Sequence, residues 1–164
     1  MNLASLTNYA KHKDGTYVAL EMDEHSRDLL DNFAHMNLGL TERIAKDQYH
    51  CTIIYSRTPV PYAETLYRST TAIGRAEGYD VFKTKDGGKC LVLRVNIPEA
   101  MYLNSLLNQN GATSDYDSYK PHVTLCYDYK GDEDVSKLPV PPFALSFDSL
   151  TVDPLDPLFV PKNN

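Results

Sequence analysis

The chain has 164 residues, of which 42% are hydrophobic and 23% charged, a composition typical of a globular domain with its own core. Its formal net charge of −6 argues against long RNA or DNA as a partner, because phosphate neutralisation requires clustered Lys and Arg. No apolar run has the length of a membrane span, and the N-terminal residues lack the apolar centre of a signal peptide. We therefore expect a cytoplasmic protein with no membrane partner.

The first third of the chain predicts a strand, a helix and a second strand. Residues 15–22 alternate, with Val18, Leu20 and Met22 on one face and Tyr17, Ala19 and Glu21 on the other. Asp23 suits the N-cap of a helix whose apolar stripe comprises Leu29, Leu30, Phe33, Ala34 and Leu38, and Gly39 suits its end. A strand over 49–56, within QYHCTIIYS, follows a polar loop.

The rest of the chain repeats this order. Prolines after residue 57 favour a short helix over a central strand, and residues 70–84 read as extended. The segment KTKDGGK predicts a hairpin into a strand that begins at KCLVLRV. A helix over 98–110 has Pro98 in its first turn, and a strand over 121–128 lies within YKPHVTLCY. A last strand covers 143–152, before a proline-rich tail over 154–164 that should lie on the surface.

The two halves match in spacing as well as in order. Leu20 precedes His50 by 30 residues, and Leu93 precedes His122 by 29. This pattern predicts an α+β fold of two β-α-β-like lobes related by a pseudo-two-fold axis, with antiparallel sheets flanking a central cleft. Residues 1–164 would form a single bilobal domain, with approximate lobes 15–60 with 129–153, and 70–128.

A His-x-Thr pair lies on each of the two matching strands, at His50 and Thr52 and at His122 and Thr124. Because side chains alternate along a strand, imidazole and hydroxyl share one face, while Cys51, Ile53 and Tyr55, or Val123, Leu125 and Tyr127, would fill the core side. The sequence thus predicts two imidazoles and two hydroxyls that converge from opposite walls of the cleft.

This set of groups suits phosphodiester cleavage. A neutral histidine can accept the proton of an attacking hydroxyl, and a protonated one can donate a proton to the leaving oxygen. The threonines can donate hydrogen bonds to the non-bridging oxygens. No metal or cofactor is expected, because this chemistry requires no metal and the sequence has no clustered set of carboxylates. The three cysteines (Cys51, Cys90 and Cys126) lie in apolar runs and are predicted to be buried free thiols.

The paired motifs in two β-α-β-like lobes resemble those of the 2H phosphoesterase superfamily. YHCTIIYS and PHVTLCY more narrowly resemble the bacteriophage anti-CBASS enzymes, which destroy cyclic oligonucleotide signals. The resemblance implies that His50, Thr52, His122 and Thr124 are catalytic, that the substrate is a cyclic di- or trinucleotide, and that a ribose 2′-hydroxyl is the nucleophile. A phage-encoded protein of this kind would act in the host bacterial cytoplasm.

Four further residues are candidates for substrate binding. Tyr17 could stack on a base, Arg94 and Lys120 could contact phosphate, and Phe159 could close over a bound base. Ordinary packing or solvent exposure is at least as good an interpretation for Tyr17, and it is the favoured one for Arg94, Lys120 and Phe159.

Three other functions remain open from the sequence. A 2H enzyme could act on RNA 2′,3′-cyclic phosphate or 2′,5′ ends, and a nucleotide-binding sponge would need the cleft but no paired proton shuttles. A structural protein could carry the histidines incidentally. The sequence also leaves open the bases and ring size of the substrate, which histidine is the acid, the final product and the oligomeric state.

Overall fold

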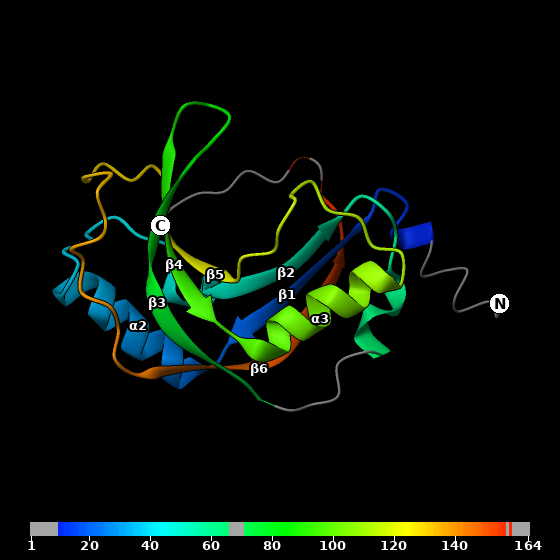
Figure 1. The fold of residues 1–164 in the computed structure, drawn as a ribbon, viewed down its shortest axis with the longest axis horizontal. Coiled ribbons are helices and arrows are strands. Elements are labelled where there is room, and N and C mark those ends of the chain that lie inside the picture. The colour runs from blue at the N-terminus through cyan, green and yellow to red at the C-terminus, as the bar shows by residue number, and fades with distance from the viewer. Residues whose placement is uncertain (1–9, 66–70, 157, 159–164) are drawn as a thin grey trace.

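The computed structural model describes residues 10–65, 71–156 and 158, and it has the predicted α+β class (Figure 1). Along the described chain the main elements are β1 (Thr16–Met22), α2 (Glu24–Met36), β2 (His50–Ser56), β3 (Ala72–Lys83), β4 (Lys89–Asn96), α3 (Pro98–Gln109), β5 (His122–Cys126) and β6 (Ala144–Pro154). Short 3₁₀ helices span Lys46–Gln48 and Pro61–Thr65. None of the helices in these ranges has the length and apolarity to cross a membrane.

The six strands join into one closed antiparallel sheet in the order β1-β2-β5-β4-β3-β6, with β6 paired to β1. Exchanging β1 with β4, β2 with β5 and β6 with β3 leaves this cyclic order unchanged, as expected for two similar halves. The matched spacing of the two halves corresponds to matched strand pairing, since Leu20 pairs with Cys51, next to His50, and Leu93 pairs with Val123, next to His122. Because the sheet closes on itself, the two motif strands are neighbours within it and do not face each other from two separate sheets.

Both predicted helices form, but α2 is shorter than predicted, because Leu38 of its expected apolar stripe lies beyond its end. The Asp23 carboxylate caps α2 by accepting a hydrogen bond from the Ser26 N–H at 2.8 Å. This helix ends at Met36, and Gly39 follows in the left-handed region with φ 65°. Helix α3 has Pro98 in its first turn, as its missing N–H allows, and ends at Gln109.

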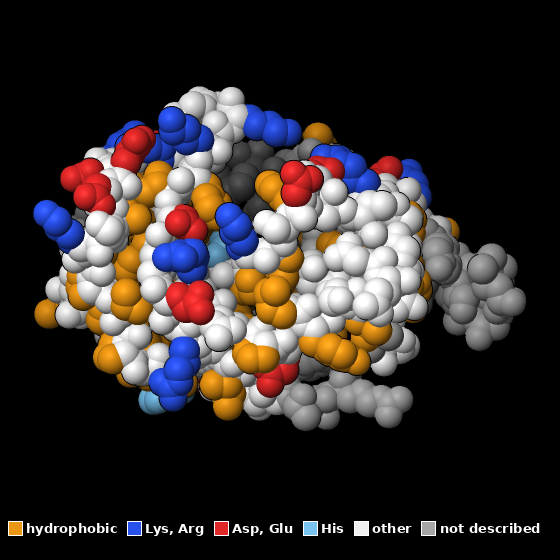
Figure 2. Space-filling view, in the orientation of Figure 1, with side chains coloured by type: hydrophobic (Ala, Val, Ile, Leu, Met, Phe, Trp, Pro, Cys, Tyr) orange, Lys and Arg blue, Asp and Glu red, His pale blue; other side chains and the backbone are white. Residues whose placement is uncertain are grey.

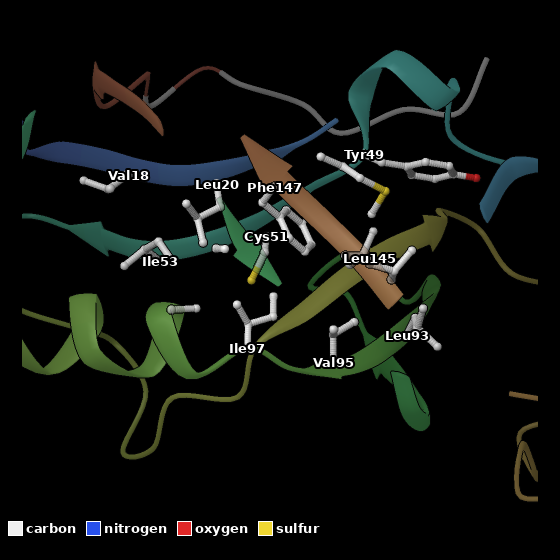
Figure 3. Packing of buried hydrophobic residues seen from close by; sticks show 14 of the residues in the cluster. Val18, Leu20, Tyr49, Cys51, Ile53, Leu93, Val95, Ile97, Leu145 and Phe147 are labelled. Carbon is white, nitrogen blue, oxygen red and sulfur yellow. The ribbon is translucent and has the colours of Figure 1, made fainter. Parts of the chain in front are cut away.

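The core lies inside the closed sheet and takes one face of each strand. Figure 3 shows β1, β2, β4 and β6 side chains packed together there, among them Val18, Leu20, Cys51, Ile53, Leu93, Val95, Leu145 and Phe147. Val123 and Leu125 of β5 belong to the same cluster, and the three cysteines are buried as predicted. Burial of this apolar surface is the main source of stability for the fold.

Tyr55 departs from the prediction that it fills the core. Its side chain is 38% exposed, whereas the neighbouring Ile54 is buried. The cause is a β-bulge, because Ala19 pairs with Thr52 and Val18 with Ile54, which leaves Ile53 as the extra residue. The bulge reverses the alternation beyond Ile53 and turns Tyr55 toward solvent.

The start of the expected tail is held against the body of the protein. Strand β6 runs to Pro154, two residues beyond the predicted strand, and pairs this residue with Thr16. The next residue, Leu155, is buried, and its N–H donates to the Gly15 carbonyl at 3.1 Å. The rest of the predicted 154–164 tail, except 156 and 158, lies outside the described residues.

Candidate active site

The two His-x-Thr motifs lie side by side on β2 and β5. Cys51 pairs with Val123, and both side chains are fully buried on the core side. In an antiparallel register this pair places Thr52 opposite His122 and His50 opposite Thr124. The four half-buried motif side chains therefore gather on the sheet face that points away from the core, so that the structure brings together the four residues that the sequence predicted.

The two imidazole rings are held in the same way. Nδ1 of His50 lies 2.7 Å from the Gln48 carbonyl oxygen, and Nδ1 of His122 lies 2.8 Å from that of Lys120. Because a carbonyl oxygen only accepts, each Nδ1 carries the proton and donates it. This leaves Nε2 as the nitrogen that can exchange a proton, and within the described ranges neither Nε2 has a hydrogen-bond partner.

Burial and nearby charges shift the pKa of His122. The pKa of His122 is lowered from its ordinary value, chiefly because burial disfavours the charged ring. The nearby His50 lowers this pKa further, while the hydrogen bond to the Lys120 carbonyl and the charge of Asp80 act in the opposite direction. His122 is therefore a neutral imidazole at neutral pH and is able to accept a proton at Nε2.

Each motif threonine is hydrogen-bonded to a tyrosine. The Tyr17 hydroxyl lies 3.0 Å from Oγ1 of Thr52, and Tyr127 has a hydrogen bond with the Thr124 side chain. Burial raises the pKa of both phenols, so they stay protonated at neutral pH. From the sequence, Tyr127 is predicted only to pack in the core, because residues three apart on a strand point to opposite faces.

An aromatic ring lies edge-on to each histidine. Tyr17 is 6.3 Å from His50 between ring centroids, with an interplanar angle of 77°. Phe82 of β3 is 5.2 Å from His122 at 82°, and 37% of this residue is exposed. Phe82 is not predicted from the sequence, since it lies 40 residues before His122 and only the β3–β4 hairpin brings the two rings together.

The cross-strand partners of the two histidines carry opposite charges. Glu21 of β1 pairs with His50, and Arg94 of β4 pairs with His122. Arg94 Nε also lies 3.3 Å from Oδ2 of Asp80 in a half-exposed ion pair. Arg94 therefore lies next to the motif residues, as predicted.

The other two candidates for substrate binding differ in their placement. Lys120 is an exposed residue whose backbone carbonyl orients His122. Phe159 lies outside the described residues.

Positive and negative side chains are mixed on the face of the molecule seen in Figure 2. Figure 2 shows Lys and Arg side chains interspersed with Asp and Glu on one face, without a continuous basic stripe. Within the same residues, no group of three or more His, Cys, Asp and Glu side chains is arranged to hold a metal ion.

Comparisons with known proteins agree on one family and one fold. The chain is 34% identical over 114 residues to anti-CBASS protein Acb1 of Vibrio phage KVP40. The aligned region covers 70% of this chain and 73% of the phage protein. The chain is 32% identical over 113 residues to the protein of the same description from Enterobacteria phage T4, with 69% and 72% covered.

Solved structures give the same picture for the fold alone. E. coli LigT complexed with 3′-AMP superposes with a TM-score of 0.53 at 15% identity, over 85% of this chain and 86% of that one. A structure described only as a phosphoesterase gives 0.55 at 14% identity, with 85% and 86% covered.

The family profile spans nearly the whole described chain. Residues 14–160 match the family described as anti-CBASS protein Acb1, and this range contains both motif strands and both helices. This match, together with the relatives above, shows that the chain belongs to the anti-CBASS protein Acb1 family, and its fold is similar to that of LigT.

Proposed function

We propose that this protein is a metal-independent phosphodiesterase that opens cyclic di- and trinucleotides of the cyclic GMP-AMP type at a 3′-5′ bond. By destroying such a signal in the host cytoplasm, it would protect a phage from CBASS defence. Family membership supports the class of substrate. The observation that carries the chemistry is the matched anchoring of two histidines through Nδ1, which leaves both Nε2 atoms available on one face.

The reaction needs no nucleophile from the protein. One Nε2 takes the proton from a ribose 2′-hydroxyl, and O2′ bonds to the adjacent phosphorus. The P–O5′ bond breaks, and the other, protonated Nε2 gives its proton to O5′. The product is a linear nucleotide that ends in a 2′,3′-cyclic phosphate. Attack by water, with the two histidines in reversed roles, converts that end to a 3′-phosphate and restores the starting protonation states.

His122 is the base in the first step, and His50 is the acid. The lowered pKa of His122 supports this assignment, since a neutral imidazole is what the first proton transfer requires. His50 differs from His122 in its cross-strand neighbour, which is Glu21 on β1 where His122 has Arg94 on β4. The assignment therefore uses the difference in surroundings between two otherwise similar motifs.

The threonines and the flanking residues hold the substrate. The hydroxyls of Thr52 and Thr124 donate to the non-bridging oxygens, where negative charge grows in the transition state. Arg94 contacts a phosphate by exchanging its ion pair with Asp80 for the ligand. Lys120 adds positive charge next to His122, and the ring of Tyr17 contacts a nucleobase of the substrate.

The test is the incubation of cyclic GMP-AMP with purified protein in excess chelator. Ring opening by a 2′-hydroxyl gives an isomer with the mass of the substrate, so chromatography must precede mass spectrometry. The later hydrolysis adds the mass of one water, and ¹⁸O-water would label the terminal phosphate. A His50→Ala, His122→Ala double variant is compared with His25→Ala, His35→Ala, which removes two exposed histidines of α2.

The expected result is a linear product from the wild type and from the α2 variant, and intact substrate from the motif variant. Intact nucleotide in all reactions would overturn the proposal, and RNA with 2′,3′-cyclic ends would then be the next substrate to test. Tight binding without turnover, retained in the motif variant, would identify a sponge.

A further inference from the structure

The seam between the two motif strands has few ladder hydrogen bonds. In the described chain, β2 and β5 share a single register pair, Cys51 with Val123. The other junction between the halves, β3 with β6, has four pairs, from Ala72 to Arg75. The spacing of the histidines thus depends on contacts other than the sheet ladder.

Two side chains from the second half supply such contacts. The Tyr119 hydroxyl, in the segment before β5, donates to the backbone carbonyl of Thr52 at 2.8 Å. The Asn104 side-chain amide, on α3, donates to the carbonyl of Ile53 at 2.9 Å. Ile53 is the bulged residue, so its carbonyl needs a partner outside the regular ladder.

Packing and a second polar contact hold Tyr119 in this position. Its ring packs against the core cluster, and its oxygen lies 3.6 Å from Sγ of the fully buried Cys51. Burial raises the pKa of the Tyr119 phenol and raises that of the Cys51 thiol to about 11, so both groups keep their protons. The phenol proton goes to the Thr52 carbonyl, since a carbonyl cannot donate, and the phenol oxygen can accept from the thiol.

We propose that Tyr119 and Asn104 are positioning residues that set the spacing of the two His-x-Thr motifs by fastening β2 to the second half of the protein. Neither side chain touches the reacting atoms. Both act through the backbone of the first motif, at Thr52 and at the residue that follows it. The inference deepens the proposed function and rests on it for its catalytic consequence, but the geometry it predicts can be measured without any substrate.

The main test is an NMR titration of the His122 ring in the ligand-free protein, in wild type and in Tyr119→Phe. The charged and titratable neighbours of this ring are His50 on β2, Asp80 on β3 and Arg94 on β4, and the ring also donates to the Lys120 carbonyl. Loss of the phenol hydroxyl should let β2 move away and let water reach the ring. The pKa of His122 should then rise toward its ordinary value, because burial and the charge of His50 are what lower it.

Tyr79→Phe is the matched control. Tyr79 is a buried tyrosine whose hydroxyl, like that of the partly buried Tyr119, donates to a backbone carbonyl, that of Pro139, at 2.7 Å, but it does not join the two motifs. The proposal requires the His122 titration to move in Tyr119→Phe and to stay at the wild-type position in Tyr79→Phe. An unchanged titration in Tyr119→Phe, or an equal shift in both variants, would overturn it.

Asn104→Ala provides a second variant that should fold readily, because alanine is a better helix former than asparagine. We expect both Tyr119→Phe and Asn104→Ala to lower kcat on the cyclic dinucleotide by about tenfold or more, with KM within about threefold, since displacing a proton shuttle slows chemistry more than binding. A KM effect alone would contradict a positioning role. If neither the wild type nor any variant turns over the nucleotide, the proposed function fails. The NMR titration still tests whether Tyr119 sets the spacing of the two motifs.

Discussion

Ile53 and Leu125 are equivalent residues in the two halves, since each is the bulged residue directly after a motif threonine. Thr124 pairs with Val92 and Cys126 with Leu91, which leaves Leu125 unpaired on β5 just as Ile53 is on β2. Each bulge carbonyl finds its partner in the other half. Ile53 accepts from the Asn104 amide, and Leu125 accepts from the Ile44 N–H at 2.9 Å. Bulges next to active sites bend strands and re-aim side chains, and here both motifs end at one.

The motif threonines should be needed for the rate more than for stability. We expect Thr52→Val and Thr124→Val each to lower kcat by about 10²- to 10³-fold, the loss typical of one transition-state hydrogen-bond donor. Steady-state kinetics with thermal melts of the same samples test this. Ser substitutions, which keep the hydroxyl, should retain most of the activity, and equal losses in the Ser and Val variants would contradict a donor role.

The acidic limb of the pH–rate profile should report His122. Because its pKa is lowered, the limb in kcat/KM should have its midpoint below the ordinary histidine value of about 6.5. Asp80 raises this pKa, so Asp80→Asn should move the limb to still lower pH. A shift of the limb to higher pH in this variant would contradict the assignment of His122 as the base.

Arg94 should act in binding. Charge-assisted hydrogen bonds contribute about 1.5–3 kcal/mol, so Arg94→Gln should raise KM by about ten- to a hundredfold with a smaller change in kcat. The measurement is initial rates at low and high salt, where the wild type should lose more affinity than the variant. Unchanged KM in the variant would remove Arg94 from the phosphate site.

A stability prediction concerns a pair away from the motifs. Arg43 donates to both carboxylate oxygens of Asp31, at 2.7 Å and 3.2 Å, and this interaction lowers the pKa of Asp31. Asp31→Asn should reduce the free energy of unfolding by about 1–3 kcal/mol at neutral pH, because one partner of a mostly buried pair is lost.

The pH dependence of that loss follows from the sign of the shift. A lowered folded-state pKa stabilises above the unfolded value near 3.8, and this contribution is lost as the pH falls through the folded value. The gap between wild type and variant in urea unfolding should therefore close at strongly acidic pH. Asp28→Asn, which breaks the exposed ion pair with Lys46, should lower the free energy of unfolding much less than Asp31→Asn does, because solvent screens this pair.

The sequence alone determined the elements and the motif residues. Alternation and capping placed β1, α2, β2, α3 and β5 because these signals act between near neighbours, as when Asp23 caps the helix that begins one residue later. Two His-x-Thr pairs at matched spacing were enough to mark His50 and His122, because strand alternation alone puts imidazole and hydroxyl on one face.

The tertiary structure decided what lies next to those faces. Closure into one sheet made β2 and β5 neighbours, the curled hairpin brought Phe82 to His122, and the bulge at Ile53 turned Tyr55 outward. Tyr119 meets Thr52 across 67 residues of chain. Contacts of this kind arise from long-range packing and register, for which a local pattern of side chains carries no signal.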